Sequence, residues 1–244
     1  MNKFKQAIVG AALLFFALFH LYTALFGTFE PLIQRAIFIG VGLFLAFLLA
    51  PQESLLQRAV SWVLALAALY GAVSVVMNNV RLMDVLEDLT QLDKIVGLLT
   101  IACVLEGARR TVGWALPVLS IVALGYYWFG ADIIGGSWRP PRISSETAMR
   151  TLTSQTSGVY GYLADVGTRV IAIFVIYGSL LMATGGGDAF IRLATFIAGR
   201  RHGGPAKVAV VSSALFGTVS GSAVANVMAL GTITIPSMNR AGYP

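Results

Sequence analysis

The chain has 244 residues, of which 57% are hydrophobic and 11% charged, with a formal net charge of +6 and a mean hydropathy of +0.80. Soluble domains carry about a quarter charged residues, so this composition excludes an ordinary water-soluble fold and predicts an all-α polytopic membrane protein. The basic residues gather at the ends of apolar runs, as the positive-inside rule describes, so we expect no nucleic-acid partner.

Three apolar runs near the start are each long enough to cross a bilayer, since about 20 helical residues span a hydrocarbon core of about 30 Å. They cover about residues 7–26, 32–50 and 55–77. The first run follows Lys3 and Lys5, but it is longer than a signal-peptide core and no clear Ala-x-Ala cleavage site follows it. We therefore predict an uncleaved first helix and antiparallel neighbours joined at Pro31 and Pro51.

His20 lies inside the first run. An ionisable group at membrane depth is a candidate proton relay. Because no acidic residue occurs in the same run, a neutral histidine bonded to a neighbouring helix is the favoured interpretation.

A mostly acidic segment at 78–94 predicts an external loop or an interfacial helix. Two crossings follow at about 95–105 and 112–129, and the former is short unless it includes Glu106, Arg109 and Arg110. The spacing of Glu106 to the two arginines predicts local ion pairs. The single cysteine, Cys103, excludes disulfides within this chain and predicts a small core residue.

Between residues 130 and 167 the composition changes to Gly, Ser, Thr, Pro and charged residues, which predicts a linker with an amphipathic segment at 131–167. It separates a helical region at 1–130 from a second region at 168–244. A sixth crossing is expected at about 170–183, followed by a short interfacial helix at 188–198 with Asp188 as its N-cap.

Orientation follows from the distribution of basic residues. A cytoplasmic N-terminus places Arg58, Arg109, Arg110 and the 200–207 cluster inside and the acidic 84–93 segment outside. Basic residues of the 130–167 segment fall outside, against the rule: Arg139, Arg142 and Arg150.

Residues 215–236 interrupt an apolar segment with small and hydroxyl-bearing residues. Gly217, Gly221, Gly231 and Pro236 weaken helix continuity, and backbone groups freed in hydrocarbon must be satisfied by protein, water or a ligand. Uncharged oxygens suit a hard cation such as Na⁺, and the N-terminus of a half-helix suits a carboxylate.

Small residues are also typical of tightly packed membrane helices. The run at 217–223 contains seven consecutive residues with none larger than valine, which is denser than packing requires and favours a ligand site. No metal-ligand spacing, phosphate-binding loop or Gly-x-Ser-x-Gly elbow occurs in the sequence. We therefore expect neither an enzyme nor an organic cofactor.

The second half carries a family resemblance in Gly203-Gly204-Pro205-Ala206-Lys207, in the run from Gly217 to Val227, and in Thr234-Ile235-Pro236-Ser237-Met238. These stretches closely resemble the large membrane subunit of tripartite ATP-independent periplasmic (TRAP) transporters. The stretches 105–113 and 127–130 resemble the small-subunit region of the fused permeases in the TAXI branch. By this resemblance residues 1–130 are small-subunit-like, and residues 168–244 begin the large permease domain.

The resemblance implies a bacterial inner-membrane permease that receives an organic acid from a periplasmic solute-binding protein. Transport would follow an elevator motion driven by a coupling ion, Na⁺ or H⁺. A second hairpin and further helices would follow Pro244, so we expect an N-terminal fragment with an incomplete elevator-type fold that does not transport alone. The alternative is a structural membrane subunit without its own transport site.

The resemblance also assigns site residues within a first re-entrant helical hairpin, with Na⁺ held at Ser220 and Ser222. The entry motif comprises Gly203, Gly204, Pro205 and Lys207. The tip that holds ion and substrate comprises Gly217, Thr218, Ser220, Gly221, Ser222, Ala223 and Asn226.

Overall fold

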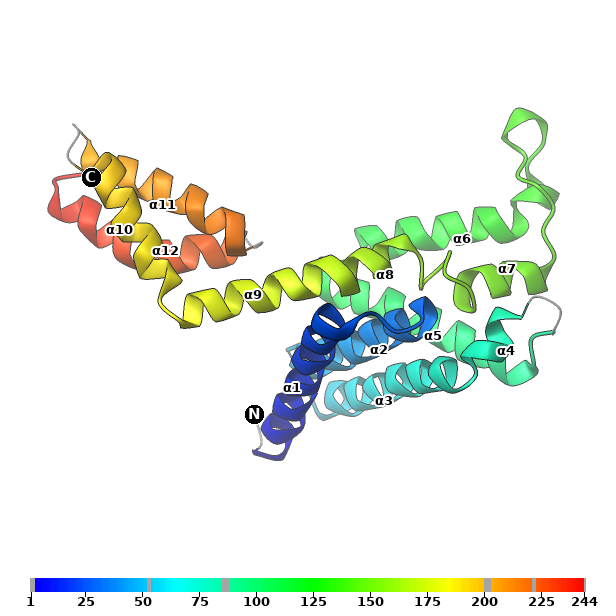
Figure 1. The fold of residues 1–244 in the computed structure, drawn as a ribbon. Coiled ribbons are helices and arrows are strands. Elements are labelled where there is room, and N and C mark those ends of the chain that lie inside the picture. The colour runs from blue at the N-terminus through cyan, green and yellow to red at the C-terminus, as the bar shows by residue number, and fades with distance from the viewer. Residues whose placement is uncertain (1–2, 52–53, 85–87, 200–202, 221–222, 244) are drawn as a thin grey trace. The chain divides into compact units, whose positions relative to one another are not determined.

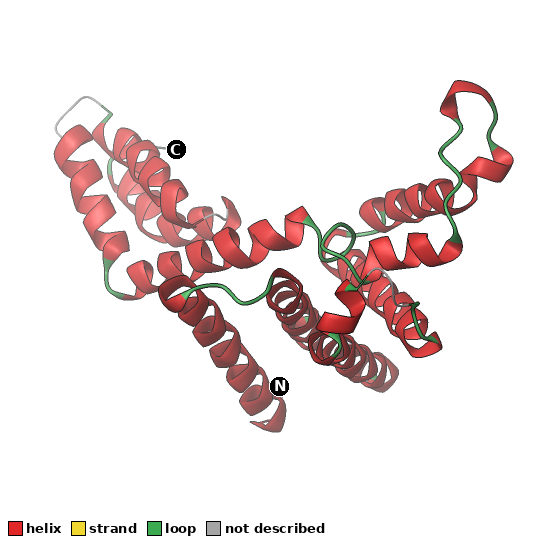
Figure 2. Ribbon diagram, turned by 45° about the vertical axis from the view of Figure 1, so that its right-hand side comes forward, coloured by secondary structure: helices red, strands yellow, loops and turns green. Residues whose placement is uncertain are grey.

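The computed structural model describes residues 3–51, 54–84, 88–199, 203–220 and 223–243. These residues form helices and loops and contain no strand (Figure 2). They divide into two compact units, Met1–Arg169 and Val170–Pro244.

The first unit is a bundle of five long helices joined by shorter elements (Figure 1). The long helices are α1 Lys3–Phe26, α2 Pro31–Leu49, α3 Leu55–Met77, α5 Gln91–Val112 and α6 Ala115–Ile133. The shorter elements are α4 Asn79–Met83, a 3₁₀ turn at Gly136–Trp138, α7 Ser145–Thr153 and α8 Tyr162–Val166. Pro31 opens α2, and reciprocal capping boxes begin α3 at Ser54 and α5 at Thr90.

Helix α2 is the centre of this bundle because it packs against α1, α3, α5 and α8. Its buried side chains Phe44, Phe47 and Leu48 meet small residues of α3 and Cys103 of α5. Cys103 is fully buried and forms no disulfide, so its prediction as a small core residue is confirmed.

Five stretches of the described residues are long and apolar enough to cross a membrane, so the chain is a multi-pass membrane protein. They are Lys3–Phe26, Pro31–Leu49, Leu55–Met77, Ala115–Ile133 and Tyr162–Ala183. The predicted crossing at 95–105 is not among them. It lies inside α5, which has 22 residues. Asp93 and Lys94 lie near one end of α5, and Glu106, Arg109 and Arg110 lie near the other. A segment of α5 long enough to cross a membrane therefore includes several charged residues.

Gly40 allows α2 and α3 to approach closely, because a Cβ at this position would overlap the Cβ of Ala72. We expect Gly40→Ala to destabilise the first unit by about 1 to 3 kcal/mol, the usual cost of overpacking. Gly42→Ala is the matched control, since nothing lies within 4 Å of a Cβ there and alanine is the better helix former. Thermal unfolding in detergent compares the two variants, and equal losses of stability would contradict the close contact.

Arg35 of α2 ties down the loop between α7 and α8. Its guanidinium donates to the carbonyl oxygens of Thr156 at 3.3 Å and Tyr160 at 2.8 Å and to the Asp165 carboxylate at 3.1 Å. Asp165 also pairs with Arg169 at 2.9 Å. One side chain of the central helix therefore holds a loop that is distant in sequence.

The second unit contains α9 Ala172–Ala183, α10 Gly186–Ala198, α11 Gly204–Ser220 and α12 Ala223–Arg240. A π-helical turn at Gly167–Ile171 leads from α8 into α9. Helix α11 packs against α9, α10 and α12 (Figure 1). The hairpin segment is therefore the centre of its own unit.

The prediction that Asp188 caps the short helix is wrong. Helix α10 begins at Gly186, and its N-cap is Gly185, whose φ is 90°. Glycine adopts this left-handed conformation without a steric penalty, so the chain turns into the helix three residues before Asp188. Asp188 lies in the first helical turn, where the helix dipole favours a negative charge.

Three of the residues expected to weaken helix continuity in 215–236 do not end a helix. Helix α11 continues through Gly217, and α12 continues through Gly231 and Pro236. A helical glycine costs only about 1 kcal/mol relative to alanine, which packing can offset. Gly221 lies outside the described residues, between the end of α11 and the start of α12.

Candidate functional site

The candidate site lies in the hairpin formed by α11 and α12, which pack against each other. Asn226 of α12 joins the helices, since its Nδ2 donates to the carbonyl oxygen and to the hydroxyl of Ser213, each at 3.1 Å. A backbone carbonyl can only accept, so this contact fixes which atom of the Asn226 amide is nitrogen. The amide oxygen, Oδ1, is therefore the atom that remains for another contact.

Oδ1 of Asn226 is buried and has no hydrogen-bond partner in the part of the chain that the structure describes. An unsatisfied buried acceptor costs about 1 to 3 kcal/mol. A carbonyl-type oxygen is a preferred ligand for hard cations. Asn226 is thus held by one amide atom and can offer the other to a ligand.

Two other predicted tip residues, Gly217 and Thr218, lie in the described part of α11. A Cβ at Gly217 would lie 3.8 Å from the Asn226 Nδ2, so these two residues face each other across the hairpin. The Thr218 hydroxyl donates to the carbonyl oxygen of Leu215 at 2.6 Å, and the side chain is exposed. Its oxygen can still accept a bond or coordinate an ion.

The remaining tip predictions are not tested by the geometry. Ser220 ends α11 and Ala223 begins α12. Gly221 and Ser222 lie outside the described residues. The assignment of Ser220 and Ser222 as ion ligands stays a prediction.

The entry motif forms the N-terminal end of α11. Gly203 has a φ of +72°, in the left-handed region that favours glycine. Gly204 and Pro205 begin the helix, where the missing N–H of proline loses no helical bond. The Lys207 N–H donates to the Gly203 carbonyl oxygen at 3.1 Å, so this motif sets where the helix starts.

Two glycines of neighbouring helices support the hairpin. A Cβ at Gly178 of α9 would overlap the carbonyl oxygen of Val219, so α9 approaches the backbone of α11 beside its C-terminal end. Phe216, 3% exposed, packs edge-on against Phe190 of α10 and lies over Gly187. The role of Gly178 is missing from the sequence predictions, although a lone glycine within an apolar crossing is a signal for close packing.

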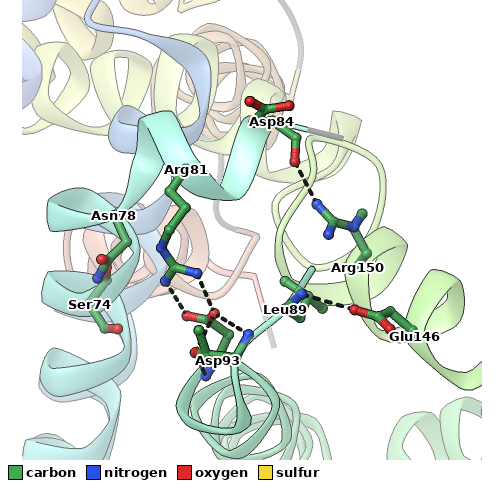
Figure 3. Close-up of polar contacts among 9 residues, drawn as sticks. Ser74, Asn78, Arg81, Asp84, Leu89, Asp93, Glu146 and Arg150 are labelled. Atoms are coloured by element: carbon green, nitrogen blue, oxygen red, sulfur yellow. Dashed lines mark hydrogen bonds and ion pairs between the residues drawn. The ribbon is translucent and has the colours of Figure 1, made fainter. Parts of the chain in front are cut away.

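A polar cluster in the first unit has a structural explanation (Figure 3). Arg81 donates two hydrogen bonds to Asp93, both at 2.8 Å, and Asp93 also accepts from the N–H and hydroxyl of Thr90. The Arg81 hydrogen bonds are the main cause that lowers the pKa of Asp93 to about 2. The described residues of the acidic segment, predicted as a loop or interfacial helix, therefore form the short helix α4 and a loop at residues 84 and 88–90 that is fastened to α5.

Helix α7 is fastened to the same loop. Glu146 accepts from the Leu89 N–H at 2.9 Å, and Arg150 donates to the Asp84 carbonyl oxygen at 2.8 Å (Figure 3). These contacts join elements that are about 60 residues apart and explain why charged residues occur in both segments.

His20 is fully buried between three segments of the first unit. Its Nδ1 lies 2.7 Å from the Phe16 carbonyl oxygen and its Nε2 3.1 Å from the Thr168 hydroxyl, to which Gln34 also donates. An Nδ1–H tautomer satisfies both ring nitrogens, because Nε2 can accept from the hydroxyl. A neutral histidine bonded to a neighbouring segment, the favoured interpretation, agrees with these contacts.

The profile of the family described as "Tripartite ATP-independent periplasmic transporter, DctM component" matches residues 98–244, more than half of the chain. The chain belongs to this DctM family. Both helices of the hairpin lie inside the match. The family's description names it as a component of a transporter.

Relatives of this DctM family member are similar over short stretches. The uncharacterized protein y4mL of Sinorhizobium fredii is 42% identical over 86 residues, which cover 35% of this chain and 20% of the relative. The C4-dicarboxylate TRAP transporter large permease protein DctM of Rhodobacter capsulatus is 38% identical over 74 residues, covering 30% and 17%. The protein of the same name in Vibrio cholerae is 35% identical over 94 residues, covering 38% and 21%.

The chain thus matches about a fifth of the length of these relatives. No solved structure matches it. The DctM match begins at residue 98, inside the region that the TAXI resemblance assigns to the small subunit. The division at residues 130 and 167 stays a prediction.

Proposed function

We propose that this chain belongs to the permease of a secondary-active transporter that imports organic acids together with Na⁺. The observation that carries the proposal is the buried Oδ1 of Asn226, which has no partner among the described residues and lies within the segment matched by the DctM family. An uncharged amide oxygen favours Na⁺ over a proton as the coupling ion, because it does not titrate in the physiological range.

The α11–α12 hairpin is proposed to enter and leave the membrane on one side. Helix α11 has 17 residues, and at about 1.5 Å per residue it reaches about 26 Å, less than the hydrocarbon core of about 30 Å. A short apolar helix followed directly by a second one favours a re-entrant arrangement over two full crossings. The tip residues would then lie at membrane depth, where transporters hold ions and substrates.

The proposed substrate is a carboxylate. Helix α12 begins at Ala223 beside the tip, and the first N–H groups of a helix together with its dipole attract anions. The names of the Rhodobacter capsulatus and Vibrio cholerae relatives specify C4-dicarboxylates. Four-carbon dicarboxylates are therefore the first substrates to test.

The remaining parts of the proposal follow the family resemblance. A periplasmic solute-binding protein delivers the acid to the bacterial inner membrane, and the N-terminus of the chain lies in the cytoplasm. A second hairpin completes the site, and an elevator motion moves it, as in the TAXI-branch fused permeases. The chain is then the N-terminal part of such a permease, and tests of transport require the complete transporter.

Replacing Ser220 and Ser222 by alanine in the complete transporter tests the proposed ion ligands. We expect uptake of labelled dicarboxylate to need about tenfold more Na⁺, because a hydrogen-bond-type contact to a charged group is worth about 1.5 kcal/mol or more. Ser179→Ala is the control, since that exposed hydroxyl of α9 bonds the carbonyl of Val175. Unchanged uptake and Na⁺ dependence in the double variant would favour a structural subunit instead.

A further inference from the structure

A pocket of about 170 Å³ opens at one end of the first unit, where α2 ends, α3 begins and α5 ends. It is lined by Ala50, Pro51, Gln57, Arg109 and Arg110. None of these residues belongs to the hairpin. The pocket therefore belongs to a different part of the protein from the proposed transport site.

Among the described residues at the pocket, positive charges outnumber negative ones. Glu106 accepts hydrogen bonds from Nε and Nη2 of Arg109 and from Nε of Arg110, at 2.6 to 2.8 Å. These bonds lower the pKa of Glu106 to about 2, chiefly through Arg109, so the carboxylate is ionised at neutral pH. One negative charge thus faces two guanidinium groups, and a positive charge is left over.

Each arginine also keeps one NH₂ group for a ligand. Nη1 of Arg110 donates to the Ser61 hydroxyl at 2.7 Å. No described residue accepts a hydrogen bond from Nη1 of Arg109 or Nη2 of Arg110. Neither is among the buried nitrogen atoms without a partner, so both reach the surface, and both arginines line the pocket.

The two guanidinium groups are held in place before any ligand arrives. Arg109 lies 5.1 Å from the ring centre of Trp114, and Arg110 lies 5.3 Å from that of Phe47. Cation–π contacts of this kind and the shared carboxylate fix the side chains, so an anion would bind without ordering them. Planar forks of N–H donors are well suited to the oxygens of a phosphate group.

Large apolar side chains are exposed at the start of α3 and next to the end of α5, the helix ends that form the pocket. Leu55, Leu56 and Trp114 are 83%, 74% and 65% exposed. Helices α2 and α3, whose ends form the pocket, are both candidate membrane spans. Arginines, a tryptophan and exposed leucines at the ends of spans are typical of the level where headgroups meet acyl chains.

We propose that this pocket binds the phosphate group of an anionic phospholipid, with the acyl chains against Leu55, Leu56 and Trp114. Free phosphate has the same charged oxygens, but it has no part that would cover these apolar side chains. Basic pockets between membrane helices are known to take lipid headgroups. The lipid would join the ends of α2, α3 and α5 from outside.

The test measures lipid binding to the purified protein in detergent by native mass spectrometry. The probes are phosphatidylglycerol, which is anionic, and phosphatidylcholine, which is zwitterionic. We expect phosphatidylglycerol to bind more tightly, and Arg109→Gln to weaken it about fivefold, the usual effect of one basic residue at a membrane surface. Arg109→Gln leaves Glu106 paired with Arg110, so folding is expected to survive, as the thermal unfolding midpoint will show.

Arg58→Gln is the matched control, because Arg58 is exposed at the start of α3 and does not line the pocket. It should leave phosphatidylglycerol binding within twofold of the unmodified chain. Should Arg109→Gln unfold, Arg109→Lys keeps the charge, loses the fork, and is expected to weaken binding by a smaller factor.

Three results would overturn the proposal. Equal losses in Arg109→Gln and Arg58→Gln would show a diffuse charge effect without a pocket. Equal binding of the two lipids would show that the phosphate-binding arginines do not select charge. Displacement of phosphatidylglycerol by millimolar inorganic phosphate would assign the pocket to a soluble anion.

Discussion

Asn226→Ala lowers the apparent Na⁺ affinity of the complete transporter by about 10- to 100-fold, which is the largest effect we expect from a single hairpin substitution. The reason is the buried Oδ1, which has no partner among the described residues and is the proposed ligand atom. Loss of a buried contact to a charged group costs about 1.5 to 3 kcal/mol. The measurement is initial dicarboxylate uptake into proteoliposomes at increasing Na⁺ concentration, in the presence of the binding protein.

Ser213→Ala separates this ion effect from the contact between the two helices. The variant removes the hydroxyl that Asn226 bonds, but it keeps the Ser213 carbonyl oxygen and leaves Oδ1 untouched. We expect its Na⁺ dependence to stay within about threefold of the unmodified transporter. The Asn226 Nδ2 keeps its bond to the Ser213 carbonyl oxygen, so the loss of the second, neutral bond costs only about 0.5 kcal/mol. Equal defects in Ser213→Ala and Asn226→Ala would indicate that Asn226 only joins α11 to α12.

Asp93→Ala is expected to destabilise the first unit by about 3 kcal/mol. Its side chain is 6% exposed and its two oxygens bond Arg81, and removing one partner of a buried pair costs about 3 to 5 kcal/mol. Arg81 is 30% exposed, so water can reach its guanidinium, which places the loss near the lower limit. Denaturant unfolding in detergent measures it.

Asp132→Ala is the control for that substitution. Asp132 pairs with Arg142 at 3.4 Å, and both side chains are 73% exposed. An exposed pair of this kind contributes about 0 to 1 kcal/mol. A similar loss in the two variants would show that the burial of Asp93 has no energetic consequence.

The free energy of unfolding at acidic pH tests the same Arg81–Asp93 pair. The pKa of Asp93 is lowered to about 2 in the folded chain, against about 3.9 for an unperturbed aspartate. Because the folded pKa is the lower one, the stabilisation is complete above about pH 5 and is lost as the pH falls through about 2, with a total of about 2.5 kcal/mol. Asp93→Ala should lack this part of the pH dependence. If the free energy of unfolding of the variant still fell by the same amount between about pH 5 and pH 2, the role of the pair would be contradicted.

The long helices could be predicted from the sequence because their apolar runs end at prolines and polar residues. The runs at 32–50 and 55–77 correspond to α2 at Pro31–Leu49 and α3 at Leu55–Met77. The crossing expected at about 95–105 lies within a longer helix, because the boundaries of α5 are set by the Thr90 capping box and by Gly113, both outside its apolar centre. The start of α10 depends on the left-handed φ of Gly185, which a run of three glycines does not locate.

The polar contacts could be predicted only where the partners are one helical turn apart. Glu106 with Arg109 and Arg110 forms the expected i, i+3 and i, i+4 pairs. The bond between His20 and Thr168 joins residues 148 positions apart, and no periodicity of the sequence indicates it. In the hairpin, the sequence pointed to Asn226, but the contact with Ser213 that leaves Oδ1 available depends on how α11 and α12 pack.

The Arg35 contacts have a consequence for how this chain can change during evolution. Two of its acceptors are main-chain oxygens, those of Thr156 and Tyr160, and an amino acid of any type carries such an oxygen. The contact therefore requires arginine at position 35 but no particular amino acid at position 156. Substitutions at position 156 can accumulate without loss of this contact. Lysine at position 35 could not replace the arginine, because a single ammonium nitrogen does not reach several oxygens that a planar fork reaches at once.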